Sequence, residues 1–348
     1  MGPGIVIAGE GARTHRPVLC RMVSRFREVG LPWRPVKDSR MLIVDEEQAQ
    51  AVLETLDVPA LVTDVIHSQG RGDAVVPVRA SLRHGDVWFA AMPALIAGRA
   101  LGAKLVAAFP ANAAAAAPTH QAVVILLDPH SGVLDAIVAA EALTRYRTTA
   151  MSIVATRLMA ARAKGRHAIL GAGAQGNAHL DAFARAGLID ELAVWSRTPA
   201  HAGALAARAR TLGLNARTFD TADAAVAGCD VVTTTTGSEK PLFGDGALAA
   251  RVHVNAIGAC VCDKREIPPA FVVRASIAVD SRAAARVESG DLLLALAAGA
   301  EKWNTICELD GATRGTAPTL FVSLGIGSVD VAVAAEIVAR VRAASGPS

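Results

Sequence analysis

The sequence has few aromatic side chains and no hydrophobic run long enough to cross a bilayer. Aromatic residues make up 4% of the 348 residues, whereas hydrophobic residues make up 52%. The longest apolar runs, such as 122–127, are far shorter than the roughly 20 residues of a membrane-spanning helix. We therefore expect neither a membrane protein nor a disordered chain. The abundance of alanine and valine is typical of an α/β protein with buried parallel strands.

The sequence also lacks a strong net charge and a cysteine pair at the common metal-binding spacing. The formal net charge is +3, and residues 1–40 carry eight Arg or Lys but three acids. Beyond that segment no basic face for nucleic acid is expected. The five cysteines include one close pair, Cys260-x-Cys262, whose spacing favours packing over a zinc half-site. We expect no metal site and no nucleic-acid partner.

Residues 1–40 contain no apolar stretch of the kind found in secretory signals. Their arginines could suggest an organellar transit peptide, but Glu10, Glu28 and Asp38 argue against it. We predict a disordered or superfluous extension at 1–40. We also predict a cytoplasmic protein, because free thiols suit a reducing compartment.

A glycine-rich stretch follows a short apolar run at 167–170 and precedes a helical pattern at 179–186. In a strand–turn–helix context such glycines permit a tight turn, close approach of backbone to a pyrophosphate, and close packing of helix on strand. Glycine turns can also serve packing alone, but these flanks indicate a dinucleotide site. The residues that match the phosphate-binding loop are Gly171, Gly173, Ala174, Gln175 and Gly176.

The next predicted strand ends in Ser196, Arg197 and Thr198. An acidic residue at this point would bind the ribose 2′-hydroxyl of NAD, whereas an arginine suits the 2′-phosphate of NADP. The sequence therefore predicts NADP(H) as the preferred cofactor, with NAD(H) possible.

The distribution of predicted elements indicates two domains. Strands and helices alternate from 167 to about 310, as in a doubly wound parallel sheet. Several strands are expected within 75–127, a long helix within 140–164, and a Gly-rich turn with an amphipathic helix at 320–342. We predict an α/β fold with a Rossmann domain at 148–319, and a second, strand-rich domain built from 41–147 and 320–342.

Three cations stand in otherwise apolar segments: Arg79, Lys104 and Arg147. Buried Arg or Lys is rare unless paired. Brought together, two arginines could hold a carboxylate, with a lysine near the reacting carbon. From the pattern alone, surface or salt-bridged cations are the simpler explanation of these residues.

A dozen short motifs resemble, in their order, those of the ornithine cyclodeaminase/mu-crystallin family. The resemblance covers roughly residues 41–342 and implies a Rossmann domain plus a substrate domain that also forms a homodimer interface. The motifs are "VPVR" with Arg79, "MPA" at 92–94, "KLV" at 104–106, "PTHQ" at 118–121, "LLDPHSG" at 126–132, "TRYRTTA" at 144–150, "GAGAQ", "WSRT", "NAIGA" at 255–259, "VDS" at 279–281, "ESGD" at 288–291 and "SLGIG" at 323–327.

The resemblance also implies residue roles. Arg79 and Arg147 would bind the substrate α-carboxylate, and Lys104 would polarise the imine or carbonyl carbon or relay a proton. His120 would lie near the nicotinamide, although without the resemblance it reads as an ordinary structural histidine. Further cofactor contacts would come from Thr236, Ile257 and Ser323.

Two departures distinguish the branches of the family. Authentic cyclodeaminases carry a catalytic aspartate after the fifth Rossmann strand, where this chain has Cys260, a thiol with an ordinary pKa near 8.5. Asp263 aligns better with an aspartate of the imine-reducing members and is the candidate catalytic acid. The cyclodeaminases also have an acid where this chain has Ser196 and Arg197.

These features predict an NAD(P)H-dependent reductase of small ketimine or cyclic imine carboxylates, or the equivalent amino-acid dehydrogenase. One alternative is ornithine cyclodeaminase, an NAD-dependent lyase that forms proline and ammonia. Another is a crystallin-like protein that binds NADPH with little turnover. The expected partner is a small imino or amino acid.

Overall fold

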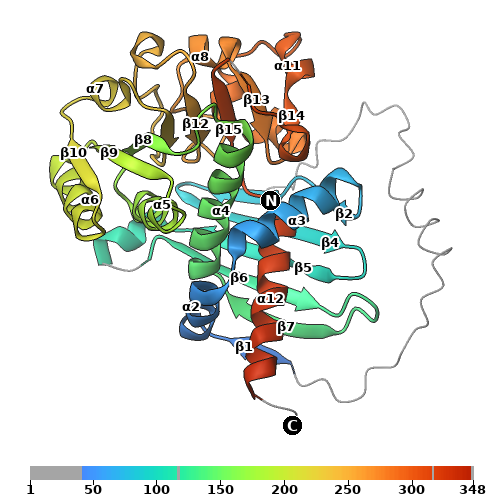
Figure 1. Ribbon diagram of the computed structural model, residues 1–348. Coiled ribbons are helices and arrows are strands. Elements are labelled where there is room, and N and C mark those ends of the chain that lie inside the picture. The colour runs from blue at the N-terminus through green and yellow to red at the C-terminus, as the bar shows by residue number, and fades with distance from the viewer. Residues whose placement is uncertain (1–40, 116–117, 316, 346–348) are drawn as a thin grey trace, which may run out of the picture.

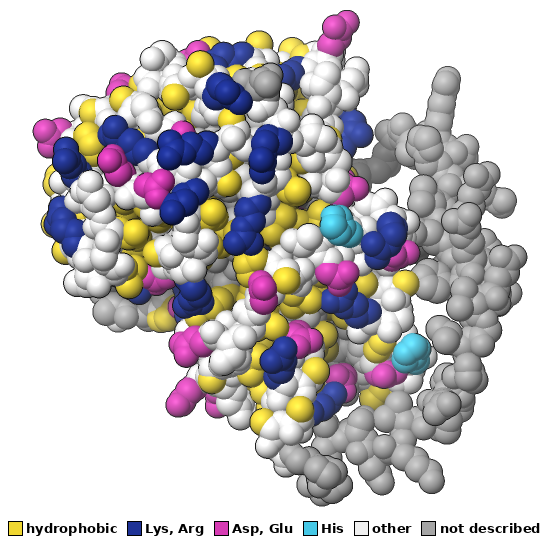
Figure 2. Space-filling view, in the orientation of Figure 1, with side chains coloured by type: hydrophobic (Ala, Val, Ile, Leu, Met, Phe, Trp, Pro, Cys, Tyr) yellow, Lys and Arg dark blue, Asp and Glu magenta, His cyan; other side chains and the backbone are white. Residues whose placement is uncertain are grey.

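The computed structural model describes residues 41–115, 118–315 and 317–345 (Figure 1). The extension expected at 1–40 lies outside the described residues. None of the described helices is both long and apolar enough to cross a membrane. On the face shown in Figure 2, Lys and Arg side chains are mixed with Asp and Glu.

The first domain is built on a seven-stranded sheet in the order β1-β7-β6-β5-β4-β2, with β3 paired to β4. Neighbouring strands are antiparallel except β1 and β7. The strands are β1 (Leu42–Val44), β2 (Ala74–Val75), β3 (Ala80–His84), β4 (Val87–Ile96), β5 (Ala100–Ala108), β6 (His120–Leu127) and β7 (Leu134–Ala139).

The second domain contains an eight-stranded, all-parallel sheet in the order β10-β9-β8-β11-β12-β15-β13-β14. The first five strands in this order form the doubly wound arrangement of a Rossmann domain, which confirms the predicted fold class. The strands are β8 (Gly165–Leu170), β9 (Ile189–Trp195), β10 (Asn215–Thr218), β11 (Val231–Thr234), β12 (His253–Ala256), β13 (Ser276–Val279), β14 (Cys307–Glu308) and β15 (Thr319–Val322).

Helices cover both faces of the parallel sheet and one face of the other. Phe183 and Leu205, on α5 and α6, belong to one core of the parallel sheet, whereas Val226 and Phe271, on α7 and α8, belong to another. α12 lies over β4, β5 and β6, next to α2, α3 and α4 (Figure 1). The helices are α2 (Glu46–Thr55), α3 (Val58–Gly70), α4 (Glu141–Met159), α5 (Ala174–Arg185), α6 (Pro199–Thr211), α7 (Ala222–Val226), α8 (Pro269–Arg274), α9 (Arg282–Glu288), α10 (Gly290–Leu293), α11 (Lys302–Thr305) and α12 (Gly327–Ser345), with short 3₁₀ turns η1 (Pro110–Ala115), η2 (Asp245–Ala247) and η3 (Leu309–Gly311).

α4 links the two domains. Its buried hydroxyls contact the parallel sheet and its helices: Ser152 Oγ lies 2.9 Å from Nε2 of His179, and Thr156 Oγ1 accepts a 3.0 Å hydrogen bond from Asn255. The helix ends at Met159, not at 164, because Ala160 is extended and begins the turn to β8. The expected domain boundary at 147/148 therefore falls inside this helix.

Three further expectations differ from the structure. Residues 320–322 belong to β15, not to a Gly-rich turn, because this fully buried apolar run inserts between β12 and β13. The first eight residues of α12 are all buried, so the helix is amphipathic only beyond them. Arg79 lies just before β3, not within a strand, and Pro77 two residues earlier has no N–H for strand pairing.

Candidate active site

The turn between β8 and α5 has the geometry of a phosphate-binding loop. Gly171 has a φ of +105°, and a Cβ on Gly176 would lie 2.0 Å from the carbonyl oxygen of Gly171. A Cβ on Gly173, by contrast, would meet no atom within 4 Å, so the space beside it is open. No side chain caps α5, so its first-turn amides remain available to an anion. This loop therefore fits the pyrophosphate of a dinucleotide.

The end of β9 presents polar side chains beside this loop. Ser196 is half-buried, whereas Arg197 and Thr198 are exposed. Among the residues that the structure describes, no acid forms a salt bridge with Arg197, and the Thr198 side chain does not cap α6. Both side chains are thus available to a phosphate group.

The first domain contributes a buried ion-pair group. Lys104 Nζ donates a 2.9 Å hydrogen bond to Oδ1 of Asp330, and Arg147 Nε lies 3.0 Å from the same oxygen. The Arg147 N–H is not aligned for a hydrogen bond, and Oδ2 of Asp330 also has no partner within the described structure. Side-chain exposure is 2% for Lys104, 8% for Arg147 and 0% for Asp330. These charges are held where water cannot screen them.

The surroundings of Lys104 lower its pKa to about 8. Burial is the main cause, and the positive charge of Arg147 adds to it, whereas Asp330 opposes the shift. Lys104 can therefore exchange a proton near neutral pH, as a general acid or base must.

Arg79 reaches the same region from the segment before β3. Its Nε donates a 2.9 Å hydrogen bond to Glu288, and its two terminal nitrogens donate to the carbonyl oxygens of Leu324 (3.2 Å) and Cys260 (2.6 Å). The guanidinium also lies 5.3 Å from the ring centroid of Trp88. Three of its five N–H groups are thus used, which leaves two for a ligand.

The loop at 323–325 touches both arginines. Its Leu324 carbonyl accepts from Arg79, and a Cβ on Gly325 would lie 2.9 Å from a terminal nitrogen of Arg147. Asp280 fixes the loop from behind, since its Oδ2 accepts from the amides of Leu324 (2.8 Å) and Gly325 (2.6 Å) and from Ser323 Oγ (3.3 Å). The positions of the two arginines therefore depend on this loop.

On the cofactor side, Glu266 joins the ends of β11 and β12. Its carboxylate accepts hydrogen bonds from Thr234 Oγ1, from the amide and hydroxyl of Thr236, and from the Gly258 amide, all between 2.6 and 2.8 Å. Asp291 in turn accepts from the Glu266 and Ile267 amides. Thr236, Ile257 and Ser323, predicted to face the cofactor, all lie at or just beyond strand ends on this side of the sheet.

The structure does not bring the candidates Asp263 and His120 into the buried group, and Cys260, which replaces the cyclodeaminase aspartate, lies beside it as a neutral thiol. Asp263 lies on the surface with 60% of its side chain exposed, 3.8 Å from Arg83. His120 is exposed at the start of β6, where partial burial and Lys264 lower its pKa. Cys260 points its Sγ at the carbonyl oxygens of Ile257 and Ser323, and burial raises its thiol pKa to about 11.

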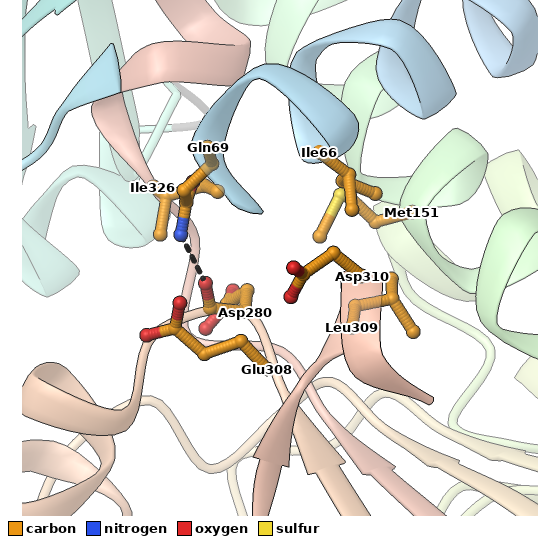
Figure 3. Close-up of a pocket in the computed structure, with 8 residues that line it drawn as sticks. All are labelled: Ile66, Gln69, Met151, Asp280, Glu308, Leu309, Asp310 and Ile326. Atoms are coloured by element: carbon orange, nitrogen blue, oxygen red, sulfur yellow. Dashed lines mark hydrogen bonds between the residues drawn. The ribbon is translucent and has the colours of Figure 1, made fainter. Parts of the chain in front are cut away.

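A small hollow lies between Gln69 at the end of α3, Asp280 and the 308–310 segment (Figure 3). Its volume of about 10 Å³ is room for one water molecule and not for a substrate. Gln69 lines one edge of the hollow, where its side-chain amide donates a 3.1 Å hydrogen bond to the backbone carbonyl of Asp280. Within the described residues, no group of His, Cys, Asp or Glu could hold a metal ion.

Sequence reasoning missed the acids that organise the site: Asp330, Glu288, Asp280 and Glu266. Glu288 and Asp280 stand in motifs that had been given no role. Asp330 had a detectable signal, because it is the single charge in the apolar run 326–335. Such a residue needs a buried partner.

Comparisons with known proteins identify the family and the overall fold. The profile of the ornithine cyclodeaminase/mu-crystallin family matches residues 41–345. Ketimine reductase mu-crystallin from Rattus norvegicus is 33% identical over 85% of this chain and 95% of its own. The Δ1-pyrroline-2-carboxylate reductase of Thermococcus litoralis, solved with NADH and L-proline, has a TM-score of 0.80 and 25% identity over 86% of this chain and 98% of its own. The iminosuccinate reductase of Paracoccus denitrificans, solved with NAD+, has a TM-score of 0.78 and 29% identity over 88% of this chain and 97% of its own. The chain belongs to the ornithine cyclodeaminase/mu-crystallin family.

Proposed function

We propose that this protein reduces small ketimine or cyclic imine carboxylates, of the Δ1-pyrroline-2-carboxylate or Δ1-piperideine-2-carboxylate type. The observation that carries the proposal is the buried group in which Lys104 and Arg147 share Asp330, close to the loop that Arg79 contacts. Arginines with unused N–H groups suit a carboxylate, and a single ammonium beside them suits the nitrogen of a C=N bond. Relatives named for imine reduction support the same chemistry.

A bound reduced dinucleotide would supply a hydride from its nicotinamide. The two arginines would hold the carboxylate so that the imine carbon stays within about 3–3.5 Å of the donor, a near-attack distance. Lys104 Nζ would hold a proton near the imine nitrogen, since a protonated imine is the better hydride acceptor. Asp263 is not assigned this role, because it lies on the surface against Arg83.

The preferred cofactor in this proposal is NADPH. Arg197 stands at the end of β9 with no acid salt-bridged to it in the described chain, and Thr198 lies beside it. Relatives solved with NADH or NAD+ support a nicotinamide dinucleotide but not this preference.

The working unit in this proposal is a homodimer joined through the sheet of the first domain. Apolar side chains are exposed on its strands, including Ile43 (63%), Leu82 (70%) and Val123 (37%). Exposed apolar area of this kind marks an interaction surface.

The test is NADPH oxidation with a panel of cyclic imines and of 2-oxo acids mixed with amines, repeated with NADH. We expect turnover with a cyclic imine carboxylate and a lower KM for NADPH than for NADH. Release of ammonia from ornithine without net change of the dinucleotide would identify a cyclodeaminase. Tight NADPH binding with no oxidation across the panel would identify a binding protein.

A further inference from the structure

The register of the first sheet shows which side chains lie beside Lys104 on the face that α12 covers. Lys104 on β5 pairs with Met92 on β4 and with Val124 on β6, and these three residues form the first row. Because side chains alternate between the two faces of a strand, the next positions on this face lie two residues further along each strand. They form a second row, Ala90, Val106 and Ala122, and a third row, Trp88, Ala108 and His120.

α12 covers the first row but not the second. The helix begins at Gly327, where a Cβ would lie 2.6 Å from the carbonyl oxygen of Met92. On the covered side of the first row Leu126 is buried, whereas Val106 and Ala122 in the second row are partly exposed. This face of the sheet is therefore open from the second row outward, directly beside the buried ion-pair group.

Trp88, in the third row, reaches toward Arg79 along the edge of this open face. The centroid of its ring lies 5.3 Å from the guanidinium carbon of Arg79, which also donates hydrogen bonds to Glu288, Leu324 and Cys260. Those three hydrogen bonds hold Arg79 independently of the indole. In the proposed function Arg79 binds the substrate carboxylate, so the indole forms a wall beside that carboxylate.

The floor between this wall and the buried ion-pair group is small and apolar. The second row consists of two alanines and one valine, whose side chains neither donate nor accept hydrogen bonds. Adjacent positions on one face of a strand are about 7 Å apart, close to the width of a saturated six-membered ring. With its carboxylate at the arginines and its C=N group at Lys104, a substrate would place its carbon chain over the second row, where methylene groups leave water.

From this geometry we infer that Trp88 limits the substrate to short aliphatic side chains and is a specificity-determining residue. The inference rests on the proposed function. Trp88, Ala90 and Ala122 stand outside the motifs that carry the family resemblance. The length of the accepted side chain is thus set separately from the groups that bind the carboxylate and the nitrogen.

The test compares two imines that carry the same charges and differ by one phenyl ring, those of methylamine with pyruvate and with phenylpyruvate. In the unaltered protein with NADPH, we expect kcat/KM to be at least about tenfold higher for the pyruvate imine. Trp88→Ala should lower this ratio by about tenfold, because the space left by the indole admits the phenyl ring. Imine formation precedes binding, so its equilibrium cancels when the variant is compared with the unaltered protein. Preference of the unaltered protein for the phenylpyruvate imine, or an unchanged ratio in Trp88→Ala, would overturn the inference.

The matched control is Phe89→Ala. This substitution removes an aromatic ring from the next residue of β4, on the opposite face of the sheet, where the paired Leu82 is 70% exposed. It should leave the ratio unchanged, and the KM for NADPH should stay within about twofold in both variants. Equal changes of the ratio in Trp88→Ala and Phe89→Ala would refute the role of Trp88.

Ala122→Leu tests the floor from the opposite direction. The larger side chain fills part of the second row, so kcat/KM for Δ1-piperideine-2-carboxylate should fall about tenfold more than that for the smaller pyruvate imine. Equal losses for the two substrates would contradict the placement of the carbon chain over this row.

Failure of the proposed function can be told apart from failure of this inference. If no imine is reduced, the proposed function fails. The side-chain limit is then measured by calorimetric binding of L-alanine and L-phenylalanine to the full protein with NADP+. Tighter binding of alanine, with the preference lost in Trp88→Ala, supports the inference, and any other result, including no binding of either amino acid, contradicts it.

Discussion

Lys104 and Asp330 form a buried ion pair with 2.9 Å between Nζ and Oδ1, although 226 residues separate them in the chain. Arg147 approaches the same oxygen, so one carboxylate opposes two cations. Breaking a buried pair from one side leaves an uncompensated charge. A substitution at either residue of this pair should therefore change the charge balance at the other.

Lys104→Ala should remove most turnover and leave the KM for NADPH within about twofold. A positioned proton donor contributes roughly 10²–10⁴-fold to rate, and Lys104 belongs to the first domain, away from the phosphate loop. Steady-state kinetics with a cyclic imine, together with fluorescence titration of NADPH, measures both quantities. If turnover survives the substitution, Lys104 does not handle the proton.

Asp330→Asn should move the alkaline limb of the pH–rate profile to lower pH. The Lys104 pKa is about 8, and Asp330 raises it by stabilising the ammonium. Without that charge the ammonium loses its proton at lower pH, so the active protonated form is lost earlier. The profile of kcat/KM between pH 6 and 10 measures this shift. If the limb does not move, its pKa is not that of Lys104.

Arg197→Ala should raise the KM for NADPH by about 10- to 100-fold and change that for NADH little. The expected loss is one or two charge-assisted hydrogen bonds to a 2′-phosphate, worth about 1.5–3 kcal/mol. The comparison with NADH is an internal control, because that cofactor has a hydroxyl in place of the phosphate. Equal effects on both cofactors would count against the 2′-phosphate pocket.

Gly176→Ala should abolish dinucleotide binding or lower the Tm, because its Cβ would lie 2.0 Å from a backbone oxygen. The matched control is Gly203→Ala in α6, where a Cβ meets nothing within 4 Å. That control should stabilise the protein by about 0.5–1 kcal/mol, since alanine is the better helix former. Thermal melts with and without NADPH distinguish the two variants.

Asp291→Asn should remove a pH-dependent loss of stability. Burial and the nearby Glu266 raise the pKa of Asp291 from 3.8 to about 7. The folded state therefore binds more protons than the unfolded state between about pH 4 and 7, and stability falls as pH rises through that window. The difference in unfolding free energy between the original protein and the variant should change between pH 4.5 and 8. A constant difference would show that Asp291 does not titrate in this range.

The sequence was sufficient for those parts of the fold that depend on local pattern. The phosphate loop could be predicted because its glycines, strand and helix are contiguous, and the family assignment from the ordered motifs is confirmed. The insertion of β15 between β12 and β13 could not be predicted, because strand pairing is set by contacts distant in sequence. Within the site, Arg79, Lys104 and Arg147 could be selected as candidates because each is a charged residue in an otherwise apolar segment.

The acids of the site were harder to assign. Asp330 is near the start of α12, where an acid is usually explained as an exposed residue that interacts favourably with the helix dipole. Only the packing of α12 on the sheet shows that Asp330 is buried beside Lys104. The prediction for Asp263 was wrong for the opposite reason: it was expected in the site but lies on the surface, because its place in a motif gives no information about its exposure.

The position of Asp330 on α12 has a consequence for the order in which the molecule assembles during synthesis. Every strand of both sheets leaves the ribosome before α12 does. Until then the ammonium of Lys104, on β5, has no counter-charge, and the face of the first sheet that α12 covers is open to water. A nascent chain can thus complete its phosphate loop early, but it completes the Lys104–Asp330 pair only when α12 docks.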